Sequence, residues 1–474
     1  MRTILSRLTI ISILLLLLDC KVPAANESIN SVQLKEKLTE LFNSSDAKNI
    51  FWGVRVTLTD NNQELFSLNK VKRFRPASNM KVVIAAAALQ ALSSEYRFET
   101  KLFNDGKNLV IVGGGDPTFT SQHFDPWIWE LKKRDIKRIN GDIIGIDSIF
   151  DDQKIGLLWS WDDLSNCYSA QVSGLQINNN CVELSLYPGQ ERYAKIKKHP
   201  DTQYVNVINS VRVTDKKSSL SFKRKEDSNN LFIDGEMNYS SPTVNKWVSV
   251  NNPTLYFTTL FYEALKNEGI TVSGRPVDAR DTGYALNRKT ALLITSAKSP
   301  PLKYIINDFL KYSINLYGES FIKLLGFIYF NEGNTYNGRL AVNLIFKKYE
   351  LPEDILFIAD GSGLSMLNLI SPDYMTQLLH HISKSYYYHT FFNALSTSGM
   401  SGTLRRRLDS PELKGHVHAK TGYIKNVRTL SGYVDTVGGQ RLTFAIFANN
   451  YENRLENAES VINKACSLMR LYKD

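Results

Sequence analysis

The sequence predicts an α+β fold whose antiparallel sheet is assembled from both ends of the chain. Three observations favour this fold. A helix that begins near Ser78 is apolar on every side, and such a helix must be buried at the centre of a domain. Short strands and turn residues dominate from about residue 100 to residue 250. The chain then returns to helical periodicity and ends in a strand hairpin and a helix.

The N-terminal part of this domain is expected to contain two helices and two strands. The residue pattern predicts an amphipathic helix over 31–42 and strands over 52–58 and 64–68. Asp60-Asn61-Asn62 supplies the turn between the strands. The all-apolar helix is expected over 76–92.

The residue pattern changes in the middle of the chain, where short strands and turns are predicted. Strands are predicted over 109–112 and 141–146. The triple glycine at 113–115 is interpreted as a turn, because no Gly-Lys-Ser/Thr motif follows it. Asp116-Pro117 would also break any helix that could hold a phosphate.

The remaining elements complete the expected domain. Helices are predicted over 256–267, 302–312, 320–330, 337–348, 372–383 and 453–471, a tight loop over 360–365, and strands over 430–434 and 442–448. We therefore expect a principal domain formed by residues 25–96 and 252–474, with inserted β-rich domains over 97–251 between its two parts.

The N-terminus predicts export. Two arginines within the first seven residues precede a largely apolar run over 8–18, which is too short for a comfortable membrane span. Small residues follow it, so residues 1–24 are predicted to be a signal peptide. The expected location is the periplasm or cell envelope, with at most peripheral membrane association. Lipid attachment at Cys20 is an alternative, although Asp19 fits such a site poorly.

Composition limits the number of domains and the kinds of partner that the chain could have. The chain has 474 residues, of which 43% are hydrophobic, enough for two or three domains with cores of their own. Its net charge of +10 fits either a soluble basic surface or attraction to an anionic polymer, such as cell-wall material or nucleic acid. No nucleic-acid motif accompanies the charge, so no nucleic-acid partner is predicted. No metal and no cofactor are predicted either, since His416 and His418 fit ordinary strand positions.

The cysteines suggest one disulfide. The sequence contains four cysteines, and Cys20 falls within the predicted signal peptide. Cys167 and Cys181 are close in sequence, and export makes a bond between them plausible. Cys466 lies in an apolar C-terminal helix and is expected to be a buried free thiol.

Ser78 and Lys81 form the first candidate catalytic pair. Positions i and i+3 of a helix share a face, so Lys81 can reach the Ser78 hydroxyl. Ser78 starts the helix, where backbone N–H groups favour negative charge. Burial and a second cation, Lys420, would both favour the neutral amine of Lys81, which can act as a base. The alternative is an N-cap serine followed by a solvated lysine, but the all-apolar run after Lys81 argues against a solvated face.

Two later motifs complete the candidate site. In Ser313-Ile314-Asn315, Ser313 could relay a proton to a leaving amine, while Asn315 could hold Lys81 and a substrate amide. On its own, the occurrence of this motif is better explained by chance. In Lys420-Thr421-Gly422, the lysine and threonine could bind a terminal carboxylate, and glycine removes a blocking side chain. The Tyr423 N–H is the expected second oxyanion donor beside that of Ser78. The order of the three motifs is typical of penicillin-binding proteins and serine β-lactamases.

The chain resembles one family over nearly its whole mature length: the class C low-molecular-mass penicillin-binding proteins, which are D-alanyl-D-alanine carboxypeptidases and endopeptidases. The resemblance lies in 75–81, 112–118, 360–365, 402–407 and 419–422, and in the long segment between the first two catalytic motifs. It implies a penicillin-binding/β-lactamase-like transpeptidase domain, an antiparallel sheet with helices on both sides, carrying a β-rich two-lobed insertion.

The resemblance also implies a function. Ser78 would be acylated by the D-Ala-D-Ala end of a peptidoglycan stem peptide, with β-lactams as inhibitors. Asp163 matches a position that reaches the diamino acid of the substrate. The chain departs from the family at Met366, where arginine is frequent, and at Lys425, where a polar residue, often glutamine, is frequent. Both positions bear on the stem-peptide side chain and leave the acylation machinery intact.

Two other functions compete with this interpretation. A β-lactamase or esterase of the same superfamily would need fast deacylation, and the sequence has no obvious additional glutamate motif for it. A non-catalytic wall-binding homologue would keep the fold, but the complete motifs argue against it. The oligomeric state is not predicted.

Overall fold

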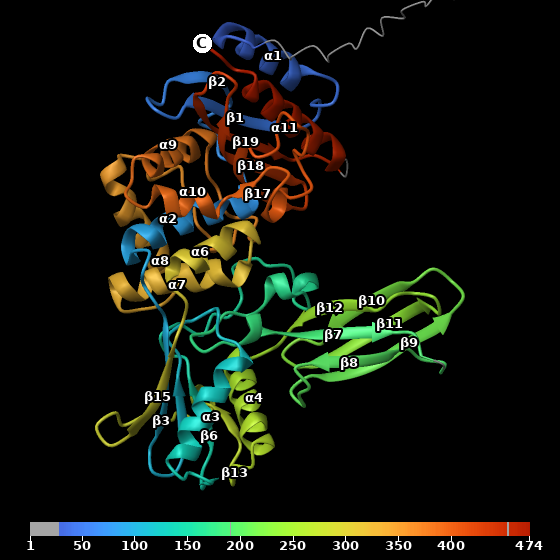
Figure 1. The fold of residues 1–474 in the computed structure, drawn as a ribbon, viewed down its shortest axis with the longest axis vertical. Helices are drawn as coiled ribbons and strands as arrows, with labels where there is room; N and C mark the ends of the chain where they lie inside the picture. The colour runs from blue at the N-terminus through green and yellow to red at the C-terminus, as the bar shows by residue number, and fades with distance from the viewer. Residues whose placement is uncertain (1–27, 190, 453–454) are drawn as a thin grey trace, which may run out of the picture.

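The computed structural model describes residues 28–189, 191–452 and 455–474. The predicted signal peptide and Cys20 lie outside these residues. In Figure 1 the two ends of the described chain lie together in the upper part of the molecule, and the middle of the chain forms the lower part and a lobe that projects sideways. Among the described residues, no helix is both long and apolar enough to cross a membrane.

A six-stranded antiparallel sheet joins the two ends of the chain. Its strands lie in the order β16-β17-β18-β19-β1-β2. Their bounds are β1 (Phe51–Leu58), β2 (Glu64–Leu68), β16 (Ser396–Thr397), β17 (Val417–Ile424), β18 (Val427–Asp435) and β19 (Arg441–Asn449). The N-terminal strand β1 therefore lies against the C-terminal strand β19, as the sequence predicted.

Side chains alternate between the two faces of this sheet, as the period of a strand requires. Phe444 and Ile446 pack with helices α1 (Ser31–Asn43) and α11 (Leu455–Arg470) on one face. Ala445 and Phe447 of the same strand pack into the helical core on the other face. The antiparallel sheet with helices on both sides is thus confirmed.

Helix α2 (Met80–Leu92) is the centre of that helical core. Every residue from Met80 to Leu89 is buried, which fits its lack of a polar face. It contacts α6, α7, α8 and α9. The helices of this layer are α6 (Leu302–Lys311), α7 (Asn315–Phe330), α8 (Thr335–Phe346), α9 (Pro372–Ser383) and α10 (Tyr388–Ala394).

Helix α7 begins at Asn315, five residues before the expected start at 320. Gly318 would ordinarily weaken a helix. Here it serves close packing, because a Cβ on Gly318 would lie 2.5 Å from the backbone oxygen of Gly361. Helix α7 therefore continues through Gly318, although glycine has a low intrinsic helix propensity.

The inserted region folds into two bodies. The first has a five-stranded sheet in the order β14-β6-β4-β3-β15, with helices α3 and α4 packed against it. Its elements are β3 (Glu99–Asn104), β4 (Leu109–Val112), α3 (Phe124–Lys133), β6 (Ile143–Ile146), α4 (Pro253–Asn267), β14 (Pro276–Asp278), the short α5 (Ala279–Thr282) and β15 (Leu292–Lys298). A small parallel pair, β5 (Arg138–Ile139) with β13 (Thr271–Val272), lies beside it.

The second body is the lobe that projects sideways in Figure 1. It contains two three-stranded sheets, β12-β7-β8 and β10-β11-β9. The strands are β7 (Cys181–Tyr187), β8 (Lys195–His199), β9 (Asn206–Thr214), β10 (Ser219–Arg224), β11 (Asn230–Asn238) and β12 (Val244–Ser249). The two-lobed insertion is therefore confirmed as part of the fold.

The inserted region ends later than expected. Strand β15 pairs with β3 in antiparallel register, and α4 packs on β6 and β14. These contacts place the segment 252–298 with the insertion, although the sequence pattern assigned it to the principal domain. The pattern could not distinguish the two because α4 is amphipathic and would fit either body. On these contacts we propose that the inserted region extends to about Lys298, beyond the expected end at residue 251.

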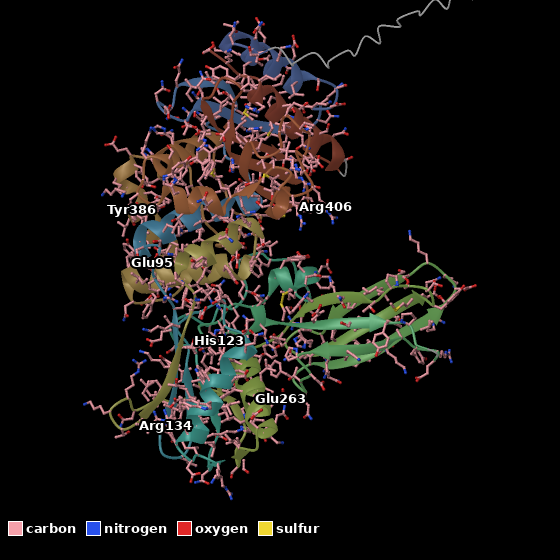
Figure 2. The ribbon with its side chains drawn as sticks, in the orientation of Figure 1. Glu95, His123, Arg134, Glu263, Tyr386 and Arg406 are labelled. Atoms are coloured by element: carbon pink, nitrogen blue, oxygen red, sulfur yellow. A yellow bond between two sulfur atoms is a disulfide. The ribbon has the colours of Figure 1, made fainter. Side chains whose placement is uncertain are left out.

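The predicted disulfide is confirmed. Cys167 and Cys181 are bonded, with their Cα atoms 5.9 Å apart. Figure 2 draws the side chains on the ribbon and shows a disulfide as a yellow bond between two sulfur atoms. The bond ties the short helix η4 (Cys167–Ser169) to the start of β7. Cys466 is a buried free thiol, as expected.

Loss of this disulfide should destabilise the protein. The double substitution Cys167→Ser, Cys181→Ser should lower the free energy of unfolding by about 2–4 kcal/mol, because the unfolded chain gains conformational freedom. Denaturant unfolding followed by circular dichroism measures the change. A reductant should destabilise the natural protein to the same extent and leave the double variant unaffected. An equal response of both proteins to reductant would contradict this role.

Candidate active site

Ser78 lies on a turn that is fastened to the main sheet. The short helix η1 (Ala77–Asn79) precedes α2, so the regular helix begins two residues later than Ser78. Asn79 is completely buried, and its Nδ2 donates to Thr429 Oγ1 of β18 at 2.6 Å. Thr429 Oγ1 in turn donates to the backbone oxygen of Pro76 at 2.7 Å. These bonds fix Ser78 at the junction of helix and sheet.

Lys81 is completely buried and makes three hydrogen bonds. Its Nζ lies 3.0 Å from Ser78 Oγ, 2.7 Å from Asn315 Oδ1 and 2.6 Å from the backbone oxygen of Ser362. Burial lowers the pKa of Lys81 to about 7, and the nearby carboxylates of Asp360 and Glu319 oppose that fall. A neutral amine that donates to Asn315 and Ser362 would direct its lone pair at Ser78 Oγ. It could then accept the proton of the serine hydroxyl.

Lys420 forms a second lysine–serine pair. Its Nζ donates to Ser313 Oγ at 2.9 Å and to the backbone oxygen of Thr421 at 2.8 Å. Burial, together with the nearby charge of Lys81, lowers the pKa of Lys420. Ser313 lies between α6 and α7 with φ of 60°, a left-handed conformation that is uncommon for serine. The three predicted motifs therefore meet at one place.

Gly422 allows β17 to approach the Ser78 turn. A Cβ at this position would lie 2.1 Å from Thr429 Oγ1 and 2.8 Å from the backbone oxygen of Pro76. A side chain would thus push the strand away from the serine. Tyr423 follows and is 51% exposed.

The edge of β17 is open beside the serine. Strand β16 pairs only with Ala419 and His418 of β17. Among the described residues, no strand pairs with that edge from Lys420 to Ile424. Thr421 Oγ1 donates to Thr403 Oγ1 at 2.7 Å, which orients the threonine at the start of the open edge. An extended peptide could pair with this edge.

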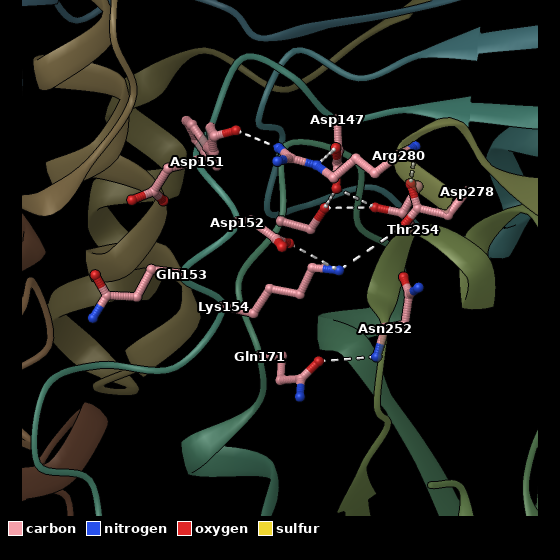
Figure 3. A network of polar contacts seen from close by, with 12 residues as sticks. Asp147, Asp151, Asp152, Gln153, Lys154, Gln171, Asn252, Thr254, Asp278 and Arg280 are labelled. Atoms are coloured by element: carbon pink, nitrogen blue, oxygen red, sulfur yellow. Dashed lines mark hydrogen bonds and ion pairs between the residues drawn. The ribbon is translucent and has the colours of Figure 1, made fainter. Parts of the chain in front are cut away.

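A polar network lies at the beginning of a long loop, residues 150–168 (Figure 3). The end of this loop contacts the site through Tyr168. Arg280 donates from Nε to Asp147 at 2.6 Å and from Nη2 to the backbone oxygen of Phe150 at 2.6 Å. Thr254 also donates to Asp147 at 2.7 Å. The loop therefore leaves the inserted body from a fixed point.

The same loop is bound to the principal domain before it reaches the site. The buried Lys323 of α7 donates to Asp151 and, at 2.6 Å, to the backbone oxygen of Gln153. Trp159 Nε1 then donates to Asp360 Oδ2 at 2.8 Å. These contacts hold the loop against α7 and against the turn at 360–365.

Tyr168 brings the loop into the site itself. Its backbone oxygen accepts a hydrogen bond from Asn315 Nδ2 at 2.7 Å. Its hydroxyl donates to Asp163 Oδ1 at 2.6 Å. Asp163 ends the short helix η3 (Trp161–Asp163) and is half-buried. Asp163, which belongs to the inserted region, is thus connected to Asn315 through Tyr168.

Two buried carboxylates behind Lys81 were not predicted from the sequence. Asp360 accepts hydrogen bonds from Gly363 N–H at 2.7 Å and Asn368 Nδ2 at 2.7 Å, and it also accepts from Ser365 N–H. Glu319 of α7 accepts from the N–H groups of the same turn. The motif 360–365 was predicted as a tight loop and was one of the segments that carry the family resemblance, but no role was assigned to Asp360. Glu319 has one available signal, its position four residues after Asn315 on the same helix face.

No metal site accompanies these residues. Within 28–189, 191–452 and 455–474, no group of three or more His, Cys, Asp and Glu side chains is arranged to hold a metal ion. The three motifs themselves bring together two serine hydroxyls, two buried lysines and an open strand edge.

Comparison with known proteins gives one family and several relatives. A sequence profile described as the D-Ala-D-Ala carboxypeptidase 3 (S13) family matches residues 34–468. The chain is 29% identical over 440 residues to the D-alanyl-D-alanine carboxypeptidase DacB of Haemophilus influenzae, covering 90% of this chain and 89% of the relative. It is 27% identical to a D-alanyl-D-alanine carboxypeptidase of Actinomadura sp. strain R39, with 88% and 81% covered.

Solved structures agree with these similarities. The fold is similar to that of penicillin binding protein 4 from Haemophilus influenzae, with a TM-score of 0.80 and 27% identity over 94% of this chain and 100% of the other. A complex of the Haemophilus protein with a β-lactam gives a TM-score of 0.75 at 26% identity, with the same coverage of both chains.

Asp360 should be essential to the turn behind Lys81. In Asp360→Asn, an amide NH₂ would replace one acceptor oxygen and face backbone N–H donors. The variant should lose about 1.5–3 kcal/mol of stability, the contribution of a hydrogen bond to a charged group. Urea unfolding provides the measurement. Asp354→Asn, at an exposed position of the same region, is the control and should leave the unfolding midpoint unchanged. Equal midpoints for the two variants would refute the prediction.

Proposed function

The chain belongs to the D-Ala-D-Ala carboxypeptidase 3 (S13) family, the class C low-molecular-mass penicillin-binding proteins, and we propose that it hydrolyses D-Ala-D-Ala stem peptides through an acyl-enzyme on Ser78. The observation that carries the proposal is the convergence of Lys81 Nζ on Ser78 Oγ at 3.0 Å and Asn315 Oδ1 at 2.7 Å, beside the Lys420–Ser313 pair. Two relatives are named D-alanyl-D-alanine carboxypeptidases, which supports peptides that end in D-Ala-D-Ala as the substrate class.

The reaction follows from these contacts in two halves. Neutral Lys81 takes the proton of Ser78 Oγ, and the oxygen attacks the carbonyl carbon of the penultimate D-Ala. The N–H groups of Ser78 and Tyr423 would stabilise the oxyanion. The C–N bond then breaks, and a proton passes through Ser313 to the leaving amine of the terminal D-Ala. Water hydrolyses the ester and restores Ser78.

The open edge of β17 is the proposed peptide site. A stem peptide would pair with its backbone, while Lys420 and Thr421 bind the terminal carboxylate. Asp163 would reach the amine of the diamino acid, since it lies on the loop that contacts Asn315 through Tyr168. Trp159 joins this loop to the turn before Met366, whose side chain is 42% exposed. Met366 and the exposed Lys425 would then tune the choice of stem peptide.

Three finer features belong to the same proposal. The open site would also admit cross-linked peptides, giving endopeptidase activity. β-Lactams would inhibit by acylating Ser78, as the β-lactam complex of the Haemophilus relative suggests. Residues 1–24 would direct the protein to the periplasm or cell envelope.

Covalent labelling tests the nucleophile. A fluorescent penicillin should attach to Ser78, because that hydroxyl lies beside the base Lys81. Peptide mapping by mass spectrometry locates the adduct, and Ser78→Ala should remain unlabelled. An adduct on Ser313 or Ser362 would overturn the assignment. Rapid loss of the label would favour a β-lactamase, and no labelling would favour a non-catalytic wall-binding protein.

Replacement of Lys420 tests the carboxylate site. The natural protein should cleave a D-Ala-D-Ala peptide acid far better than its C-terminal amide. In Lys420→Ala, cleavage of the peptide acid should lose about 1.5–3 kcal/mol of transition-state stabilisation, which is the contribution of a charge-assisted hydrogen bond. The ratio of kcat/KM for acid and amide should therefore fall. If Lys420 only stabilises the strand, the ratio will stay constant while the melting temperature falls.

A further inference from the structure

Glu319 lies behind the proposed base and is almost completely buried, with 2% of its surface exposed. Its Oε1 accepts the N–H of Ser362 at 2.8 Å, and its Oε2 accepts the N–H of Gly361 at 3.2 Å. The backbone oxygen of Ser362 in turn accepts from Lys81 Nζ at 2.6 Å. Glu319 is therefore connected to the base through one peptide turn, which it holds by two bonds.

We propose that Glu319 is a positioning residue, whose carboxylate fixes the Ser362 carbonyl against Lys81 and, when ionised, stabilises the protonated form of that lysine. This inference rests on the proposed function, because it assigns to Glu319 the control of the base in the acylation step. Glu319 itself touches neither Ser78 nor the open edge of β17 in the contacts of the described residues.

Helix α7 supplies two contacts to Lys81 from one face. Asn315 and Glu319 are four residues apart, so their side chains lie on the same side of the helix. Asn315 contacts Lys81 directly, and Glu319 does so through Ser362. A Cβ on Gly361 would lie 2.0 Å from the backbone oxygen of Gly318, so the turn and the helix are in backbone contact. Little space remains for the turn to shift without moving the Ser362 carbonyl.

A carboxylate suits this position better than an amide. Gly361 and Ser362 both present N–H donors, and an ionised glutamate has only acceptors. A glutamine could accept from one N–H, but its NH₂ group would oppose the other. The turn would then lose one of the two bonds that orient the Ser362 carbonyl.

Several charged groups surround the pair. Lys81 faces Glu319 and Asp360, and its charge also acts on Lys420 across the site. Burial and the Asp360 carboxylate raise the pKa of Glu319 to about 7. Glu319 also lines a cavity of about 190 Å³, together with Lys323 and Arg339. Lys323 is paired with Asp151, as described above.

The sign of the effect follows from these charges. Both carboxylates favour the protonated form of Lys81, while burial disfavours it. Replacing Glu319 with glutamine removes one of the two favourable charges and leaves burial in place. Lys81 would therefore lose its proton at lower pH. The rate of acylation by a neutral lysine rises as the pH increases through the pKa of that lysine. This rising part of the pH profile, the acid limb, should therefore move to lower pH in the variant.

The experiment compares pH profiles of acylation. The second-order rate constant for labelling by a fluorescent penicillin is measured between about pH 5 and pH 9, the range around the pKa of Lys81. In Glu319→Gln the acid limb should shift down by about one pH unit, the scale set by one nearby opposite charge. The plateau at high pH should fall by about tenfold to a hundredfold, because the base is misplaced.

Glu319→Asp is the conservative variant. It keeps the charge but shortens the side chain, so the acid limb should stay near that of the natural protein while the plateau falls. Leu325→Ala is the structural control, since it removes a buried apolar side chain further along α7 and changes no charge. It should lower the melting temperature without moving the limb. If Glu319→Gln does not fold, a shifted limb in Glu319→Asp still overturns the electrostatic role.

The outcomes separate this inference from the proposed function. A natural protein that is never labelled at Ser78 would defeat the proposed function. A natural protein that is labelled, together with an unmoved limb in folded Glu319→Gln, would defeat the role of Glu319 alone. The role of Glu319 is supported if the acid limb moves to lower pH in Glu319→Gln and stays in place in both Glu319→Asp and Leu325→Ala.

Discussion

The burial of Lys81 is the constraint on which most of this structure depends. An ammonium group in an apolar interior is costly, and the protein responds by lowering the pKa of Lys81 to about 7. The hydrogen-bonding capacity of the amine is still satisfied, because three oxygens from separate segments converge on it. Each segment must be held within hydrogen-bond distance. The apolar helix α2, the start of α7 and the turn at 360–365 meet that requirement together.

This requirement joins parts of the chain that are distant in sequence. The amide of Asn315 has one correct orientation, with Oδ1 toward Lys81 and Nδ2 away from it. The backbone oxygen of Tyr168 accepts from Nδ2 and so favours that orientation. Tyr168 follows Cys167, whose disulfide ties it to the inserted lobe. The insertion therefore contributes to the geometry of the lysine, beyond any contact that it makes with a substrate.

The sequence predicted the parts whose signals are local. An all-apolar helix, alternating strands and three short motifs identified the core, the sheet and the residues that meet in the site. The end of the insertion was missed because strand pairing between β3 and β15 is long-range, and neither strand has a sequence feature that names its partner. Glu319 and Asp360 were missed for a similar reason. Glu319 bonds to backbone N–H groups, which every sequence contains. Asp360 also accepts from the side chains of Trp159 and Asn368, and nothing in the sequence signals that these residues meet.

The position of Glu319 also bears on the competing β-lactamase interpretation. That function requires a base that activates water against a stable acyl-enzyme. Glu319 is the one glutamate that is buried among the described residues, and both of its oxygens accept backbone hydrogen bonds. It is therefore poorly placed to activate water.

Lys81 would then have to serve both halves of the reaction. With a peptide substrate the terminal D-Ala departs, and water can enter where the amine was. A β-lactam keeps its amine attached after ring opening, so the same space stays occupied. On the proposed mechanism, a site in which Lys81 is the base and both oxygens of Glu319 accept backbone N–H groups would favour turnover of peptides and retention of β-lactams.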